Sequence, residues 1–253
     1  MINPLYKKQV DLLLRVLPQH VPQAPVFALE GGTAINLFEQ NMPRLSVDID
    51  LVYLPFDDRA VALESIASTP QRQRNQRESK VIFTDEETQI KIEVNTIIRG
   101  HLFPVRVMDV QEIVVETFEK FASMRVLSRE ELYGGKICAA LDRQHPGDMF
   151  DVHQLLELEG LSDEIRTGFL CMLRCHPRPM NELLQPHFID QEELFAPQFF
   201  NMTEQAFGYR DYDSTWNRLL TVLHEELAEH EKNFLLSFKL GEPSRSGQTE
   251  PVG

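Results

Sequence analysis

The feature that most constrains the fold is a strand, a glycine pair, a helix and a second strand in close succession. An apolar run at residues 26–29 predicts a buried strand, and Gly31-Gly32 ends it just before residues 33–38, which have helical character. Residues 47–52 then alternate acids with aliphatic side chains, as a strand with one polar face does. This succession predicts mixed α and β structure with a glycine turn between the first strand and the helix.

The rest of the chain divides into a strand-containing part and a helical part. Further strands are predicted at 80–84, 89–97, 105–108 and 124–126. Helices are predicted from Pro4 to Pro18, over 59–67, and then over 149–157, 163–174, part of 192–207 and 214–238. Ser128 and Glu131 have the spacing of a capping box and open the helical part. We therefore expect an α+β fold: an α/β core with a mixed sheet over 1–127, a helical C-terminal domain over 128–241, and a disordered tail over 242–253.

Acids lie on the polar faces of two predicted strands, and two of them could bind a cation. Asp48 and Asp50 are one residue apart, so their carboxylates project from the same face of the strand. Unpaired, they repel each other, and Mg²⁺ relieves that repulsion while keeping room for water and substrate phosphates. Glu93 lies on the polar face of the strand at 89–97. The pattern predicts a two-metal phosphoryl-transfer site, and an exposed strand with incidental acids is the alternative.

The glycine pair favours a phosphate ligand. Between a strand and a helix, Gly31 and Gly32 allow backbone amides at the helix N-terminus to approach a phosphate closely, and the hydroxyl of Thr33 could add a contact. An ordinary turn explains a glycine pair equally well. The combination of the pair with the Asp-Ile-Asp strand is what makes the pattern specific.

Other motifs have structural explanations. Gly134-Gly135-Lys136 superficially suggests a P-loop, but the upstream glycine is missing and Ile137 replaces Ser or Thr, so we reject that motif. Asp148 follows Pro146-Gly147 and precedes an apolar helix, which makes an N-cap its simplest role. Asp151 would then lie in the first turn and favour the helix dipole.

The stretch LEGGTAINLFEQNMPRLSVDIDL resembles the signature of the DNA polymerase beta-type nucleotidyltransferases, and within them the AbiEii/AbiGii toxin-type family. That motif is a glycine pair followed, after a helix, by Arg-x-Ser-x-Asp-x-Asp, which Arg44, Ser46, Asp48 and Asp50 match. The resemblance continues in SREELYGGKICAALDRQHPGDMFDV, where the family carries a helical lysine and an Asp-x-x-Asp pair. It covers roughly residues 25 to 155.

The resemblance implies transfer of a nucleoside monophosphate from a nucleoside triphosphate (NTP), in a toxin component of a toxin–antitoxin or abortive-infection system. Asp48 and Asp50 would bind Mg²⁺, Glu93 would be the third acid, and Lys136 would contact the triphosphate. Asp148 would belong to the active-site cleft, where Gly147 replaces the usual basic residue and Arg143 could substitute for it. The nucleotide-binding residues would be Gly31, Gly32, Thr33, Arg44, Ser46 and Lys136. The implied acceptor is RNA, with the 3′ end of tRNA as one candidate, and the implied partner is a cognate antitoxin.

Composition limits the other classes of function. No stretch approaches the roughly 20 apolar residues of a membrane span, and the 3 cysteines suit a reducing compartment, so we expect a cytoplasmic protein. The formal net charge of -14 argues against wrapping duplex nucleic acid. Two alternatives stay open: modification of a protein or small molecule by the same chemistry, and a nucleotide-binding module without catalysis.

Overall fold

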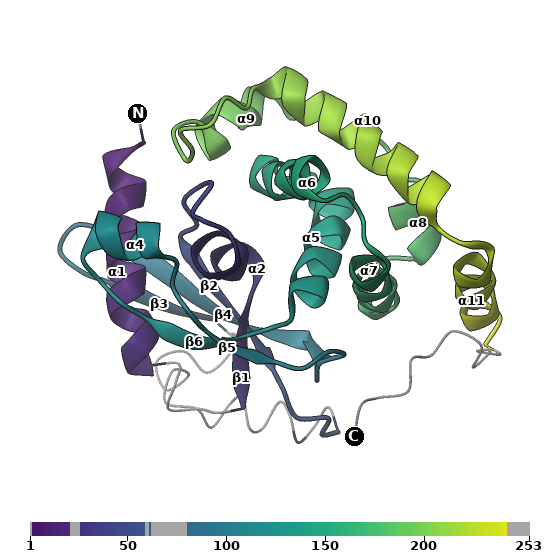
Figure 1. Cartoon of the computed structure of the whole chain (residues 1–253), viewed down its shortest axis with the longest axis horizontal. Coiled ribbons are helices and arrows are strands. Elements are labelled where there is room, and N and C mark those ends of the chain that lie inside the picture. Colours follow the sequence, from purple (N-terminus) through teal and green to yellow (C-terminus); the bar gives the residue numbers. More distant parts are fainter. Residues whose placement is uncertain (1, 21–25, 59–60, 62–79, 242–253) are drawn as a thin grey trace.

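A six-stranded mixed sheet forms one side of the computed structural model, which describes residues 2–20, 26–58, 61 and 80–241 (Figure 1). The strand order is β3-β4-β2-β1-β6-β5. Strand β1 pairs antiparallel with β2 and parallel with β6, and β2 pairs parallel with β4. The strands are β1 (Phe27–Glu30), β2 (Asp48–Tyr53), β3 (Lys80–Thr84), β4 (Gln89–Arg99), β5 (Arg106–Asp109) and β6 (Ser123–Val126). The predicted mixed sheet is confirmed.

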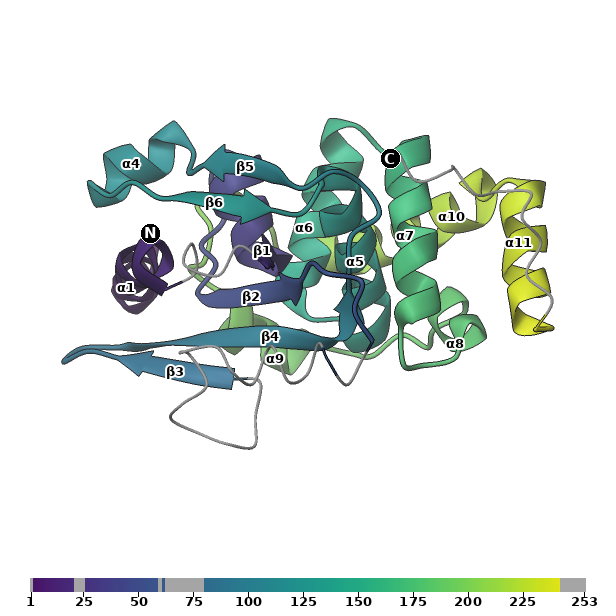
Figure 2. The same cartoon turned by 90° about the horizontal axis from the view of Figure 1, so that it is seen from below.

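Helices flank the sheet and make up much of the remaining described chain, as expected for the α+β class. Those that precede or interrupt the strands are α1 (Pro4–His20), α2 (Gly31–Thr33) with the π-helix η1 (Ala34–Glu39), and α4 (Glu112–Phe118). Those that follow are α5 (Arg129–Arg143), α6 (Pro146–Leu158), α7 (Asp163–Cys175), α8 (Met180–Leu184), α9 (Glu192–Phe199), α10 (Tyr209–Glu226) and α11 (Glu229–Lys239). Figure 2 shows the sheet on one side of the molecule and the α5–α7 group on the other.

Several boundaries differ from the sequence prediction. Helix α1 passes Pro18 and ends at His20, because a proline so near the end removes only one backbone hydrogen bond while Leu13 and Leu17 stay fully buried. The helix predicted over 214–238 is two helices, because Leu227 and Ala228 are extended and the Glu231 carboxylate accepts a bond from the Ala228 amide. Helices α4 and α8 were not predicted. The helix predicted over 59–67, except Val61, and the tail lie outside the described residues.

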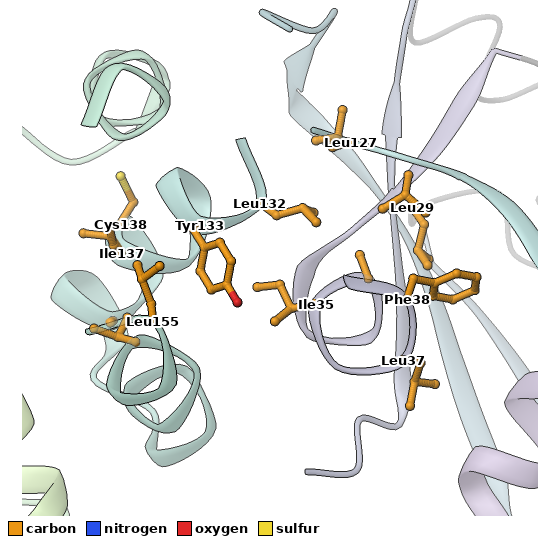
Figure 3. Packing of buried hydrophobic residues seen from close by; sticks show 14 of the residues in the cluster. Leu29, Ile35, Leu37, Phe38, Leu127, Leu132, Tyr133, Ile137, Cys138 and Leu155 are labelled. Atoms are coloured by element: carbon orange, nitrogen blue, oxygen red, sulfur yellow. The ribbon is translucent and has the colours of Figure 1, made fainter. Parts of the chain in front are cut away.

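One continuous apolar core connects the sheet to α5. Figure 3 shows Leu132 and Tyr133 of α5 pointing toward Ile35 of η1, with Leu29 of β1 behind it. Tyr133 is completely buried, and its hydroxyl accepts a bond from Gln40 Nε2 at 2.9 Å. This packing fixes the position of α5, which carries Lys136 and Arg143, relative to the glycine turn.

The first glycine of the rejected P-loop motif has a packing role. Gly134 lies inside α5, and a Cβ at this position would come within 2.4 Å of the backbone carbon of Gly168 in α7. Gly168 meets the backbone of Glu130 equally closely. Two glycines thus let α5 and α7 cross in direct backbone contact, which accounts for Gly134 without a phosphate.

Candidate active site

Three carboxylates stand in register across three neighbouring strands. Glu30 of β1 is opposite Asp50 of β2, and Asp50 is opposite Glu93 of β4. We call Glu30, Asp50 and Glu93 the acid row. All three line a cavity of ≈ 440 Å³, and Asp48 lies two residues before Asp50 on the same face of β2. The predicted grouping of Asp48, Asp50 and Glu93 is what the structure brings together, and Glu30 joins them.

The charges in the acid row are balanced at its outer end only. Lys91 Nζ lies 2.8 Å from Glu93 Oε2 and 3.7 Å from Asp48 Oδ2. Among the described residues, no ion pair involves Glu30 or Asp50. Burial and then the charge of Asp48 raise the pKa of Asp50 to about 6. Burial and then Asp50 raise the pKa of Glu30 to about 7, although Asn95 donates a hydrogen bond to its carboxylate. The inner acids therefore lack a cation.

The glycine pair lets the backbone lie directly against these side chains. Gly31 has a φ of +73°, and a Cβ there would lie 2.6 Å from Asp50 Oδ2. A Cβ on Gly32 would lie 2.8 Å from Arg44 Nη2 and 2.9 Å from Ser46 Oγ. A larger residue at position 31 would displace the Asp50 carboxylate. A larger residue at position 32 would displace the side chains of Arg44 and Ser46, which precede β2.

Thr33 and Ser46 are buried beneath the acids. Thr33 Oγ1 donates to the carbonyl oxygen of Asp48 at 2.5 Å and lies 3.1 Å from Ser46 Oγ. Since Thr33 has one hydroxyl proton, Ser46 is the donor in the second contact. Both side chains thus hold the start of β2, where Asp48 is located.

Five charged residues form a second group, which we call the ion-pair cluster: Arg44, Lys136, Arg143, Asp148 and Asp151. Arg44 binds Asp151 through two bonds, Nε to Oδ1 at 2.7 Å and Nη2 to Oδ2 at 2.6 Å. Lys136 Nζ lies 2.8 Å from Asp148 Oδ1 and 3.1 Å from Asp151 Oδ2. Arg143 binds Asp148 through Nε at 2.5 Å and Nη2 at 3.0 Å. Three cations therefore surround two acids.

Burial distinguishes the cations of the cluster. The side chain of Lys136 is 5% exposed, whereas that of Arg143 is 63% exposed, and both line the cavity that contains the acid row. Burial alone would raise the pKa of Asp148, but Lys136 and Arg143 outweigh it and hold the pKa far below the usual range. The same balance, with Arg44 and Lys136, lowers the pKa of Asp151. Both acids are therefore ionised at neutral pH.

The predicted N-cap role of Asp148 is wrong. His145 is the N-cap of α6, and its Nδ1 accepts a bond from the Gly147 amide at 3.1 Å. Asp148 lies in the first turn with its side chain turned inward to Lys136 and Arg143, both from α5. Tertiary ion pairs, which local sequence does not reveal, determine where the side chain points. Asp151 is likewise buried among Arg44, Lys136 and Asn36.

Sequence reasoning missed Glu30 and Asn95. Glu30 immediately precedes the glycine pair, at the end of β1 where it lies beside Asp50. The only local signal was its position directly before the glycine turn; the antiparallel pairing of β1 with β2, which places the end of the first strand beside the start of the second, is visible only in the structure. Asn95 has the same two-residue spacing from Glu93 that Asp50 has from Asp48.

The donor set suits a hard cation. Carboxylate oxygens are the ligands that Mg²⁺ takes in proteins, and Asp50 is a half-buried carboxylate that forms no ion pair among the described residues. Within the described ranges, no three His, Cys, Asp or Glu side chains converge closely enough to form a ready metal site. Asp48, Asp50 and Glu93 are thus adjacent carboxylates on neighbouring strands. They fit a metal site whose ligands would move closer together when the metal binds.

The family model described as nucleotidyl transferase AbiEii toxin, type IV toxin–antitoxin system, matches residues 12–244. The chain belongs to this family, and it is a nucleotidyltransferase toxin of a type IV toxin–antitoxin system.

A solved structure has the same fold. The chain is similar to MenT4, a nucleotidyltransferase toxin from Mycobacterium tuberculosis, with 14% sequence identity and a TM-score of 0.64. The likeness covers 91% of this chain and 87% of that one. The comparison with curated proteins found no match. Every helix within the described ranges is too short or too polar to cross a membrane.

Proposed function

We propose that the chain transfers a nucleoside monophosphate from an NTP to RNA, with the 3′ end of tRNA as the first acceptor to test. The observation that carries this proposal is the acid row facing Arg143 and Lys136 across one cavity. A triphosphate needs both kinds of group, since its metal requires acids and its oxygens require cations.

On the sheet side, Asp48 and Asp50 would hold Mg²⁺ and Glu93 would be the third acid. The metal, when bound, would supply Lewis-acid stabilisation of charge on the transferring phosphate. Glu93 would accept the proton of the attacking hydroxyl, directly or through water. Glu93 can accept this proton only if its ion pair with Lys91 breaks. Lys91 would then lie beside the attacking oxygen as that oxygen gains negative charge.

On the helical side, Arg143 and Lys136 would contact the triphosphate. Arg143 is exposed and is held in place by Asp148, so its guanidinium is oriented before substrate arrives. The Lys136 ammonium has three N–H groups, and two of them are directed at Asp148 and Asp151. Its remaining N–H would reach the phosphates, and Asp148 would position both cations.

The glycine turn completes the phosphate side of the proposal, with the amides of Gly31 and Gly32 as donors. Direct nucleotide contact by Thr33, Arg44 and Ser46 stays a prediction. Their bonds to Asp48, Asp151 and each other already give them a positioning role.

The test is transfer from each labelled NTP, with Mg²⁺, into total cellular RNA and protein. We expect label in RNA from the wild type and none from the double variant Asp48→Asn, Asp50→Asn. Asp109→Asn, on the exposed face of β5, is the matched control and should keep full activity. Equal labelling by wild type and double variant would exclude this assignment of the acids.

A second candidate is the same chemistry on a protein or small-molecule acceptor. The net charge of -14 favours it over a large polyanion, because phosphate backbones bind basic surfaces. Label in the protein fraction, or consumption of NTP with no label in either polymer, would select it. Nucleotide affinity without any turnover would instead indicate a binding module. The family implies a cognate antitoxin, and co-expression should restore growth that the toxin alone inhibits.

A further inference from the structure

Glu30 has a defined orientation that the proposed roles leave unused. Its Oε1 accepts a bond from Asn95 Nδ2 at 3.1 Å, and both residues line the cavity. Because β2 lies between β1 and β4, this bond crosses over β2 beside Asp50. The Glu30 carboxylate is thus held at the inner end of the acid row.

A strand irregularity fixes the orientation of Asn95. The β2–β4 register shifts after Val52↔Asn95, so that Tyr53 pairs with Arg99. Asn95 Oδ1 accepts bonds from the backbone amides of Ile97 (3.0 Å) and Ile98 (2.9 Å). Since the carbonyl end is occupied by two donors, the NH₂ end must face Glu30. The bulge therefore determines the position of the Glu30 carboxylate through Asn95.

The Glu30 carboxylate can accept a further hydrogen bond from a ligand. In its ionised form the Glu30 carboxylate only accepts, and Asn95 already uses one of its oxygens. Next to the reacting phosphates, the neutral donors that a ribonucleotide offers are its ribose hydroxyls, and the 2′-hydroxyl is what separates RNA from DNA.

Resting on the proposed function, we infer that Glu30, oriented by Asn95, accepts a hydrogen bond from a ribose hydroxyl and makes the enzyme select ribose over 2′-deoxyribose. The ribose belongs either to the NTP or to the terminal nucleotide of the acceptor. Glu30 is then a specificity-determining residue, and Asn95 is a positioning residue.

The experiment compares substrates with and without the hydroxyl. One arm pairs the transferred NTP with its 2′-deoxy form; the other pairs a tRNA acceptor-stem RNA with the same RNA ending in 2′-deoxyribose. In one arm, the wild type should prefer ribose by about tenfold or more in kcat/KM, as expected for a bond to a charged acceptor. The arm that shows this preference identifies the ribose that Glu30 contacts.

Glu30→Ala should lower the preference in that arm to about one, by slowing the ribose substrate while the 2′-deoxy substrate is unaffected. Glu30→Gln keeps the volume and should lower it partly, and Asn95→Ala should do the same by loosening the carboxylate. Glu112→Ala, on the exposed surface of α4, is the control and should leave the preference unchanged.

Two outcomes would overturn the inference. An equal loss on all substrates in Glu30→Ala would make Glu30 structural. A rise in the Mg²⁺ concentration for half-maximal rate, with the preference intact, would make it a metal ligand. If the wild type shows no transfer, calorimetric binding of the NTP and of the acceptor RNA, each compared with its 2′-deoxy form, still measures the preference, so failure of the proposed function and failure of this inference are distinguishable.

Discussion

The acid row and the ion-pair cluster face the same cavity and are built in opposite ways. In the cluster, Asp148 and Asp151 are buried, and each is in contact with two cations. In the row, Glu30 and Asp50 lie side by side with no ion pair among the described residues. Burial penalises a carboxylate in both regions, and only the cluster supplies the compensating charge. The comparison indicates that the cluster holds the fold together, whereas Asp50 in the row is kept ready for a cation.

The largest expected effect on stability comes from breaking the cluster. Asp151→Asn would leave Arg44 and Lys136 buried without their shared acid, and should lower the free energy of unfolding by about 3–5 kcal/mol. Urea denaturation measures it. Asp163→Asn, whose side chain is 85% exposed, should change stability by less than about 0.5 kcal/mol. A decrease of less than about 1 kcal/mol in the free energy of unfolding of Asp151→Asn would mean that the ion-pair cluster does not stabilise the fold.

The pH dependence of stability should separate the two regions. The pKa values of Asp50 and Glu30 are raised, from 3.8 to about 6 and from 4.5 to about 7, so their contribution is present at low pH and is lost as pH rises through 6 to 7. Between pH 5 and 8 the ionisation of these two acids should lower the stability of the metal-free protein by roughly 2–4 kcal/mol.

The pKa values of Asp148 and Asp151 are lowered, so the contribution of the cluster is present above their ordinary value of 3.8 and is lost as pH falls below it. Denaturation curves at fixed ionic strength measure both limbs. The double variant Glu30→Gln, Asp50→Asn should flatten the limb between pH 5 and 8, and the control Asp109→Asn should not. An unchanged limb in the double variant would contradict the assignment.

Magnesium should supply the charge that the acid row lacks. At about 100 times its Kd, Mg²⁺ should stabilise the protein by about 2.7 kcal/mol at pH 8. The gain should shrink below pH 6, because a protonated Asp50 is a poor ligand. Thermal unfolding with and without Mg²⁺ measures it. Asp50→Asn should abolish most of this gain in stability, and Asp151→Asn should keep it. The reverse pattern would place the metal in the ion-pair cluster and contradict the prediction.

The smallest expected effect concerns the support beneath the row. Thr33→Val removes the donor to the Asp48 carbonyl and should cost about 1–2 kcal/mol, since a buried acceptor loses its partner. Thr221→Val, which removes an exposed hydroxyl on α10, should cost less than about 0.5 kcal/mol. Indistinguishable unfolding midpoints for the two variants would show that the Asp48 carbonyl finds another donor.

Local patterns in the sequence predicted local structure well. The strand, glycine pair, helix and second strand are present, and Ser128 caps α5 by accepting a bond from the Glu131 amide. The same reasoning failed where distant residues decide. The Glu131 carboxylate binds the amides of Leu102 and Phe103 and not the Ser128 amide of an ordinary capping box, and Asp148 turns to cations of α5.

The site was predicted in the same uneven way. Asp48 and Asp50 were found because one strand carries both, and Lys136 was found through the family resemblance. Glu30 was missed because its place in the row depends on the register between β1 and β2, which no single segment encodes. Side chains that act through pairing across the sheet require the tertiary structure to be recognised.

The bond between Arg44 and Asp151 joins positions 107 residues apart. During synthesis at about 5–20 residues per second, roughly 5–20 seconds separate the appearance of these two partners. A growing chain therefore displays the acids of the sheet well before α6 arrives to anchor Arg44 and Lys136. For a toxin, this order means that the cavity cannot form until α6 has been made, and that a product terminated before α6 carries the acids of the sheet without their counterpart.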